Sequence, residues 1–272
     1  MIGVSFGSRA ALGPFGSVGD RYRLWRYVYG LKLMTDREVV HCVAPKGVLR
    51  VALNYGNRVL VDRGAGGRPQ GISVEIAGLL SDWLSVDMSF VDYHRAADVS
   101  DAAAQDLWDV CFLAVDPERA KLITFTDPYV RIDGCYLVPA RCSARDASEL
   151  FSSSVKVGSV EGSAYSLTLQ RKPGARNLRI YPDMATMFAA LDNGEVDAVA
   201  GIGDVMQIKA AQRVGARVLH PSFMDIRQAL GVPKGRFIAA AALKDFVRDL
   251  SRADMIGDIL ERHGVSRTCA LL

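Results

Sequence analysis

The stretch that decides the fold runs from Asp109 to Tyr129 and reads DVCFLAVDPERAKLITFTDPY. Its apolar run over 110–115 predicts a buried strand, Asp116-Pro117 predicts a turn, and one helical turn carrying Arg119 leads into a second strand. This order aims a guanidinium at the mouth of a parallel sheet, where α/β proteins hold small ligands. The planar fork of an arginine matches a carboxylate. The local pattern fits a surface arginine that caps a turn equally well, so both interpretations stay open at this point.

From Gly47 onward, short apolar runs alternate with segments of helical periodicity. In the segment 72–83, apolar residues recur every three or four positions, which is typical of a helix with one buried face. Further strands are predicted over 48–53, 88–91, 155–159, 178–181, 196–200 and 217–219, and further helices over 97–107, 163–169, 183–193 and 204–213, with two closing helices after 240. Strands that alternate with helices of ordinary length predict an α/β fold with mainly parallel sheets.

Two polar or proline-ended segments divide this series and predict two lobes. We expect the first lobe to comprise 47–139 plus 223–272 and the second 140–222, with crossings near Val138 and Gln228 that form a hinge. Residues 1–46 read as a poorly defined extension, within which Met34 is a plausible start and an amphipathic helix over 21–33 is conceivable. This extension lacks the apolar core of a secretory signal.

The overall composition excludes several classes of function. The 272 residues are 50% hydrophobic and 23% charged, so a sizeable core is expected, and a net charge of +3 without a basic stripe argues against nucleic acid. No apolar run is long enough to span a membrane. Five cysteines without CxxC spacing and four scattered histidines predict neither a metal site nor a disulfide framework. No cofactor motif is present.

Candidate binding residues follow the predicted strands. Gly162, Ser163 and Ala164 lie at a helix start, where free amides could hold a carboxylate, although Ser163 could simply cap the helix. Asp204, after a glycine-flexed loop, could pair with an ammonium or cap the next helix.

Loops after the first and third strands add further candidates. Asn54, Asn57, His94 and Arg95 fall at the ligand side of the sheet, although asparagine also fills tight turns. Catalytic motifs are absent, and Glu161 is the one carboxylate that could serve as a general base.

From Gly47 to the last helix, the chain resembles the family 3 bacterial solute-binding proteins, receptors that deliver polar amino acids to ABC importers. The motifs that carry the resemblance, in order, are Gly47-Val-Leu-Arg-Val-Ala, Pro69-Gln-Gly-Ile-Ser-Val-Glu75, Trp108-Asp109-Val, Asp116-Pro-Glu-Arg119, Phe125-Thr-Asp-Pro-Tyr129, Val157-Gly, Gly162-Ser163 and Gly194-Glu-Val-Asp-Ala198. The resemblance implies a two-lobe fold of the periplasmic-binding-protein type II kind.

The resemblance also implies roles for particular residues. Arg119 would bind the ligand α-carboxylate, the amides and hydroxyl of 162–164 would complete that clamp, and Asp204 would take the α-ammonium. The chain departs from the family where Phe112 and Ala114 replace small hydroxyl residues and Ala164 replaces a threonine.

Two further departures concern the ammonium end of the ligand. His94 or Arg95 stands in place of the stacking aromatic, and Asp204 sits about two residues late. Carboxylate recognition is therefore better supported than ammonium recognition.

The sequence thus predicts a monomeric, non-enzymatic protein that captures a small carboxylate-bearing solute, an amino acid or a related organic acid, for uptake through an ABC transporter permease. The resemblance implies a periplasmic location, while the missing signal keeps a cytoplasmic one open. Two alternatives are a cyclohexadienyl dehydratase-like enzyme on the same scaffold, with Glu161 or His94 as general acid, and a cytosolic metabolite sensor.

Overall fold

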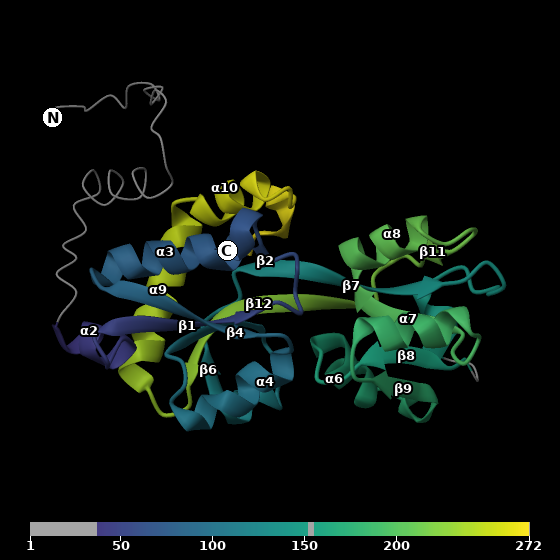
Figure 1. The fold of residues 1–272 in the computed structure, drawn as a ribbon, viewed down its shortest axis with the longest axis horizontal. Coiled ribbons are helices and arrows are strands. Elements are labelled where there is room, and N and C mark those ends of the chain that lie inside the picture. The colour runs from purple at the N-terminus through teal and green to yellow at the C-terminus, as the bar shows by residue number, and fades with distance from the viewer. Residues whose placement is uncertain (1–36, 152–154, 272) are drawn as a thin grey trace, which may run out of the picture. The chain divides into compact units, whose positions relative to one another are not determined.

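The computed structural model describes residues 37–151 and 155–271, which fall within one compact unit of the chain. The predicted start at Met34 and the conceivable helix over 21–33 lie outside the described residues. Figure 1 shows the arrangement of the described elements.

One mixed sheet organises the described residues. Its strands follow the order β4 (Asp87–Tyr93), β1 (Val48–Asn54), β5 (Val110–Ala114), β12 (Met224–Pro233), β7 (Val130–Val138), β10 (Ala198–Ile202), β8 (Val157–Val160) and β9 (Leu178–Tyr181). Within each end of this order the neighbouring strands run parallel, as in β4-β1-β5 and β10-β8-β9. This confirms the predicted α/β class.

The centre of the sheet is antiparallel. β12 pairs with β5 on one side and β7 on the other, and β7 pairs with β10. Two short strands lie off this path: β6 (Ile123–Phe125) pairs with β12, and β11 (Arg217–Val218) pairs with β7. The long strands β7 and β12 therefore connect the two parallel ends, and Figure 1 shows them extending side by side from one group of helices to the other.

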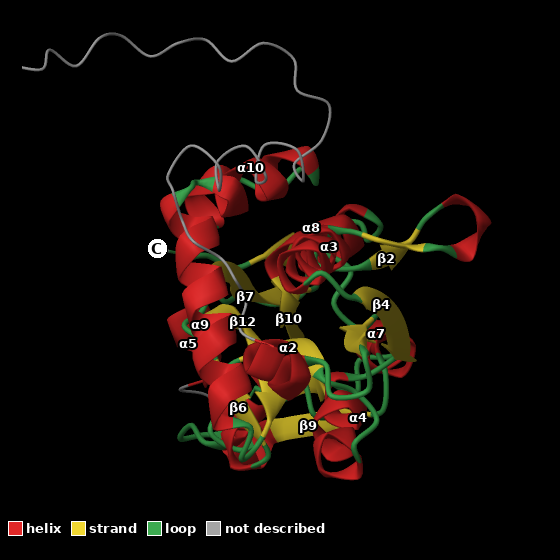
Figure 2. Cartoon of the chain, turned by 90° about the vertical axis from the view of Figure 1, so that its left-hand side faces the viewer, coloured by secondary structure: helices red, strands yellow, loops and turns green. Residues whose placement is uncertain are grey.

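Helices gather in two groups around these ends (Figure 1). The first group comprises α2 (Arg37–Val43), α3 (Ile72–Leu84), α4 (Ala96–Asp101), α9 (Phe237–Arg252) and α10 (Met255–Arg262). The second comprises α6 (Ala164–Gln170), α7 (Met184–Asp192) and α8 (Gly203–Ala211). Figure 2 looks from the side of α9, against which α2 packs. Shorter elements are α5 (Ala147–Phe151), β2 (Asp62–Arg63), β3 (Pro69–Gln70) and 3-10 turns at Ala65–Gly67, Ala102–Gln105, Arg119–Lys121, Ala175–Asn177 and Arg267–Cys269.

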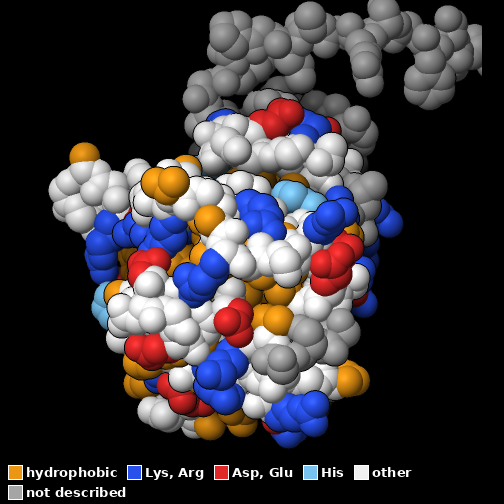
Figure 3. Space-filling model, turned by 90° about the vertical axis from the view of Figure 1, so that its right-hand side faces the viewer, with side chains coloured by type: hydrophobic (Ala, Val, Ile, Leu, Met, Phe, Trp, Pro, Cys, Tyr) orange, Lys and Arg blue, Asp and Glu red, His pale blue; other side chains and the backbone are white. Residues whose placement is uncertain are grey.

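Separate apolar clusters underlie the two groups. Trp108 is fully buried in the first with Val99 of α4, and its indole Nε1 donates a hydrogen bond of 3.1 Å to the Val99 carbonyl. Met187 of α7 and Met206 of α8 meet in the second. On the face shown in Figure 3, basic and acidic side chains are interspersed, so neither sign dominates that face.

Local signals explain most of these boundaries. Asp183 caps α7 as predicted, because its Oδ1 accepts a hydrogen bond of 2.8 Å from the Thr186 amide. The helix ends before Asn193 and Gly194, and Gly194 adopts a φ of 77° that suits glycine. In contrast, α2 arises in a stretch where the sequence predicted no element. Its valines are weak helix formers, and the packing of α2 against α9, with Val43 buried, overrides that preference.

Candidate functional site

A cavity of about 230 Å³ lies where the carboxyl ends of the parallel strands from both groups meet. Loops after β1, β4 and β5 line one side and loops after β8, β9 and β10 line the other, with two residues of β12 between them. This is the place that α/β topology favours for ligands. The lining comprises Asn54–Arg58, His94–Ala96, Ala114, Arg119, Val160, Glu161, Ser163–Tyr165, Pro182–Met184, Ile202, Val205, Ile226 and Gln228.

Arg119 is the most heavily buried cation of this cavity, with a relative exposure of 4%. Its Nη1 donates to the Ala114 carbonyl and its Nη2 to the Gly162 carbonyl, each at 2.9 Å. Its Nε has no hydrogen-bond partner among the described residues, and no carboxylate there forms an ion pair with it. Burial lowers the pKa of Arg119 to about 10. A buried, charged donor with a spare N–H can bind an anion.

The acid nearest in sequence, Asp116, is already committed elsewhere. Its Oδ2 lies 2.6 Å from Nη2 of Arg171, which follows α6, and its Oδ1 accepts from the Glu118 amide. Asp116 therefore raises the pKa of Arg119 only through longer-range attraction, which burial outweighs.

Three polar contacts join the two groups of elements around the cavity. Arg119 reaches the Gly162 carbonyl, Asp116 pairs with Arg171, and Nη1 of Arg95 lies 2.9 Å from Oε2 of Glu161. Gly162 has a φ of 65°, and a Cβ at that position would lie 2.6 Å from the Cβ of Ala97 in α4. The two groups are thus in close contact beside the cavity.

The acidic side chains of the lining are both engaged. Glu161 pairs with Arg95, which also binds Asp98 at 2.7 Å. Asp183 accepts from the amide of Thr186 as the cap of α7. Neither carboxylate is left without a partner.

The start of α6 supplies a cap. The Ser163 hydroxyl accepts from the Ser166 amide at 3.1 Å and donates to the Val160 carbonyl at 2.7 Å. Of the two interpretations given to Ser163 on sequence, the cap is therefore observed. Ser163 and Ala164 also line the cavity, while Gly162 contributes its carbonyl to Arg119.

The asparagines after β1 differ in their contacts. Oδ1 of Asn54 accepts from the Gly56 amide at 3.1 Å, which is the local turn role that asparagine often plays. Asn57 is 6% exposed, and its Oδ1 has no hydrogen-bond partner among the described residues. Asn57 thus places an unpaired acceptor in the cavity wall.

Three predicted site residues are not part of the lining: Phe112, Asp204 and Gly162, which contributes only its carbonyl to Arg119. Phe112 packs edge-on against Tyr129, with ring centroids 6.4 Å apart. Asp204 is exposed in the first turn of α8. Asn54, Asn57, His94, Ala114, Arg119, Ser163 and Ala164 are brought together by the cavity, and their roles in binding stay predictions.

Gln228 is a lining residue that the sequence pattern did not assign to the site. It is 3% exposed and pairs in register with Ala114, whose carbonyl holds Arg119. The signal that could have identified it is the period-2 pattern of 226–231, which places Gln228 on the same face as Ile226 and Leu230, with Arg227 on the other.

Metal ions, disulfides and membrane spans find no support among the described residues. Within them, no group of three or more His, Cys, Asp or Glu side chains is placed to hold a metal ion. All five cysteines are free thiols. None of the described helices combines the length and apolar character needed to cross a bilayer.

Solved structures share this fold along most of the chain. A mutant of ArgBP from T. maritima matches with a TM-score of 0.68 at 17% identity, over 82% of this chain and 98% of that one. The amino acid ABC transporter substrate-binding protein AbpA from Streptococcus pneumoniae, bound to L-arginine, matches with a TM-score of 0.67 at 20% identity, over 82% and 97%. The ancestral amino acid-binding protein AncCDT-1, a precursor of cyclohexadienyl dehydratase, gives 0.67 at 18% identity, over 82% and 97%.

These likenesses confirm the predicted type II periplasmic-binding-protein fold. No curated protein matches the sequence significantly. The sequence pattern of one family, in contrast, matches residues 49–263, which span nearly all of the described residues. The chain therefore belongs to the bacterial extracellular solute-binding proteins, family 3.

Proposed function

We propose that this protein captures a small carboxylate-bearing solute in the cavity around Arg119. The observation that carries the proposal is the buried guanidinium of Arg119, whose Nε is unpaired and which has no ion-pair partner among the described residues. Transfer of an isolated charge out of water is costly unless an opposite charge joins it. A ligand carboxylate would supply that charge through a bidentate or single N–H contact.

Two lobes would close on this solute. The proposed lobes comprise 47–139 with 223–272, and 140–222, and the separate apolar clusters support this division. β7 and β12 would serve as the hinge, since they alone among the sheet strands extend between the two groups of helices in Figure 1. The polar contacts around the cavity would then hold the closed form.

Membership of an extracellular solute-binding family supports a role as the periplasmic receptor of an ABC permease, which the protein would fill as a monomer. A dehydratase-like enzyme would instead need an available general acid at the cavity. The sequence offered Glu161 or His94 for that task; Glu161 is ion-paired with Arg95, and His94 lines the cavity as an exposed side chain. We therefore place solute capture ahead of catalysis.

A thermal-shift screen against amino acids, hydroxy acids and dicarboxylates tests the proposal. A ligand at 100 times its Kd adds about 2.7 kcal/mol to the free energy of unfolding, which raises Tm by several degrees. Arg119→Met should weaken binding by roughly 2–5 kcal/mol and abolish the shift. Lys121→Met is the matched control, because it removes an exposed cation from the same turn. A well-folded wild type that responds to no acid would contradict the proposal.

A further inference from the structure

The one deeply buried charge of the cavity lining, that of Arg119, has no opposite charge bound to it among the described residues. The lining carboxylates are exposed: Glu161 pairs with Arg95, which Asp98 shares, and Asp183 keeps its charge while its Oδ1 accepts from the Thr186 amide. Arg58 points its charge to solvent, since its side chain is 75% exposed and lies 3.9 Å from Asp62. Arg119 remains as a buried positive charge bound only to neutral carbonyls among the described residues.

A ligand group that contacts Arg119 has to bring a negative charge to this buried cation. A carboxylate alone does so. A zwitterionic amino acid brings an equal positive charge on its ammonium, which needs an anionic acceptor to offset its own desolvation and its repulsion from Arg119. Both lining carboxylates are exposed, Glu161 in an ion pair and Asp183 as a helix cap, and Asp204, which the family resemblance suggested for the ammonium, lies outside the lining.

The buried polar groups that face the remaining space are uncharged. Asn57 Oδ1 is an acceptor without a described partner, and Gln228 is a buried amide placed across the strand pair from Ala114. A neutral hydroxyl satisfies an amide oxygen with one hydrogen bond and brings no charge. An ammonium placed against the same oxygen would stay unneutralised.

Resting on the proposed function, we propose that the solute is a small monoanionic organic acid without an ammonium group, its carboxylate bound by Arg119 and its hydroxyl donated to Oδ1 of Asn57. In this assignment the uncharged side chains of Asn57 and Gln228 favour a ligand hydroxyl over a ligand ammonium. The 2-hydroxy acids are the chemical class that fits.

Matched pairs of ligands test this assignment by titration calorimetry on the full chain. The pairs are L-lactate with L-alanine, 2-hydroxyisovalerate with L-valine, and phenyllactate with L-phenylalanine. L-arginine, the ligand of AbpA, extends the series to a net cation. The hydroxy acid of at least one pair should bind more than about tenfold more tightly than its amino acid, and L-arginine should not bind.

Gln228→Glu provides a variant of nearly the same shape with one added negative charge. It should weaken the preferred hydroxy acid at least about tenfold and shift the ratio within its pair toward the amino acid. Arg119→Met should remove binding of both members. Circular dichroism and Tm establish that each variant is folded, and the wild-type pairs decide the question even where a variant fails to fold.

The outcomes separate this inference from the proposed function. Equal or tighter binding of an amino acid by the wild type, with loss in Arg119→Met, overturns the inference and leaves solute capture in place. Binding of neither member of any pair overturns the inference, and the thermal-shift screen with the wider set of acids then decides the proposed function.

Discussion

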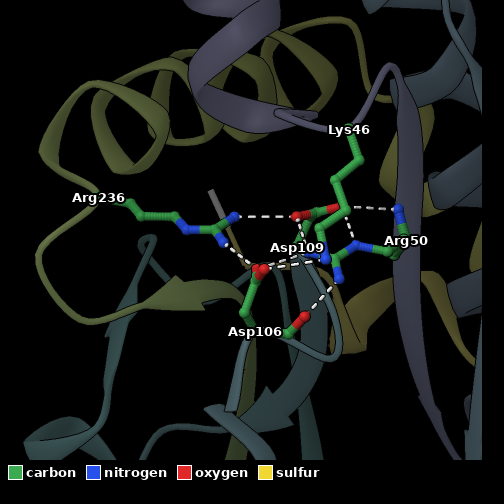
Figure 4. Close-up of polar contacts among 5 residues, drawn as sticks. All are labelled: Lys46, Arg50, Asp106, Asp109 and Arg236. Atoms are coloured by element: carbon green, nitrogen blue, oxygen red, sulfur yellow. Dashed lines mark hydrogen bonds and ion pairs between the residues drawn. The ribbon is translucent and has the colours of Figure 1, made fainter. Parts of the chain in front are cut away.

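Arg50 donates three hydrogen bonds to the carboxylate of Asp109: from its backbone amide at 3.0 Å, from Nε at 2.9 Å and from Nη2 at 2.7 Å (Figure 4). Arg236, just before α9, adds a fourth contact at 3.0 Å. Asp109 is fully buried at the entry to β5. One carboxylate thus ties β1, β5 and α9 together.

Asp109→Asn should destabilise the protein by roughly 3 kcal/mol, the lower end of the range for breaking a buried ion pair, because both arginines are partly exposed. Urea unfolding monitored by circular dichroism measures this change. Asp245→Asn is the control, since Asp245 pairs with Arg248 on the surface and should cost less than about 1 kcal/mol. Equal losses in the two variants would show that the Asp109 contacts add no stability.

The neighbouring Asp106 predicts a pH dependence. Hydrogen bonds from Arg50 and then Lys46 hold its pKa well below the usual value for an aspartate. Because the unfolded chain then binds more protons than the folded one below about pH 4, the contribution of Asp106 is present above that pH and is lost as the pH falls.

Asp106→Asn should therefore flatten the fall in the free energy of unfolding between about pH 5 and pH 2. Urea midpoints measured across that interval for both proteins test it. Parallel curves for wild type and variant would rule out the contribution of Asp106.

Gly162 provides a test of the contact beside the cavity. Gly162→Ala places a Cβ 2.6 Å from that of Ala97 and also costs about 1–2 kcal/mol for a left-handed conformation. Gly47→Ala is matched, because Gly47 has a φ of 77° and a Cβ added there would meet no heavy atom within 4 Å. We expect ligand affinity to fall in Gly162→Ala only, whereas equal affinities would mean that closure does not need this contact.

Arg119→Met should leave the ligand-free protein within about 1 kcal/mol of the wild type. The variant loses two hydrogen bonds from a charged donor, about 1.5–3 kcal/mol each, and is relieved of a desolvation cost of several kcal/mol. Chemical denaturation without ligand measures the difference. A loss comparable to that of Asp109→Asn would mean that the charge of Arg119 is compensated within the fold.

Much of the fold could be predicted because its signals are local. The apolar run before Asp116 specifies β5, the three- and four-residue spacing after Ile72 specifies α3, and Asp183 specifies the start of α7. The antiparallel pairing of β7 with β12 could not be predicted. Partners such as Met224 and Gly134 lie far apart in the sequence, and the sequence of neither strand shows which residues of the other it will pair with.

Some residues of the candidate site could likewise be predicted from local sequence, and others could not. Arg119 follows from the strand-turn sequence, and the structure brings it to the cavity. Asp204 illustrates the limit of such a pattern: an offset of two residues on a helix turns a side chain by roughly 200° about the axis. Gln228 was missed because its burial results from the strands on either side of β12. Without those strands, the sequence does not distinguish it from an exposed glutamine on an edge strand.

The guanidinium of Arg119, which has no ion-pair partner among the described residues, would link the stability of this protein to its proposed ligand. An anion at 100 times its Kd lowers the population of unfolded chains about a hundredfold. Proteases that act on the opened form degrade the protein in proportion to that population. The ligand would therefore stabilise the protein that binds it, and in the presence of proteases the ligand-bound protein would be degraded more slowly than the ligand-free protein.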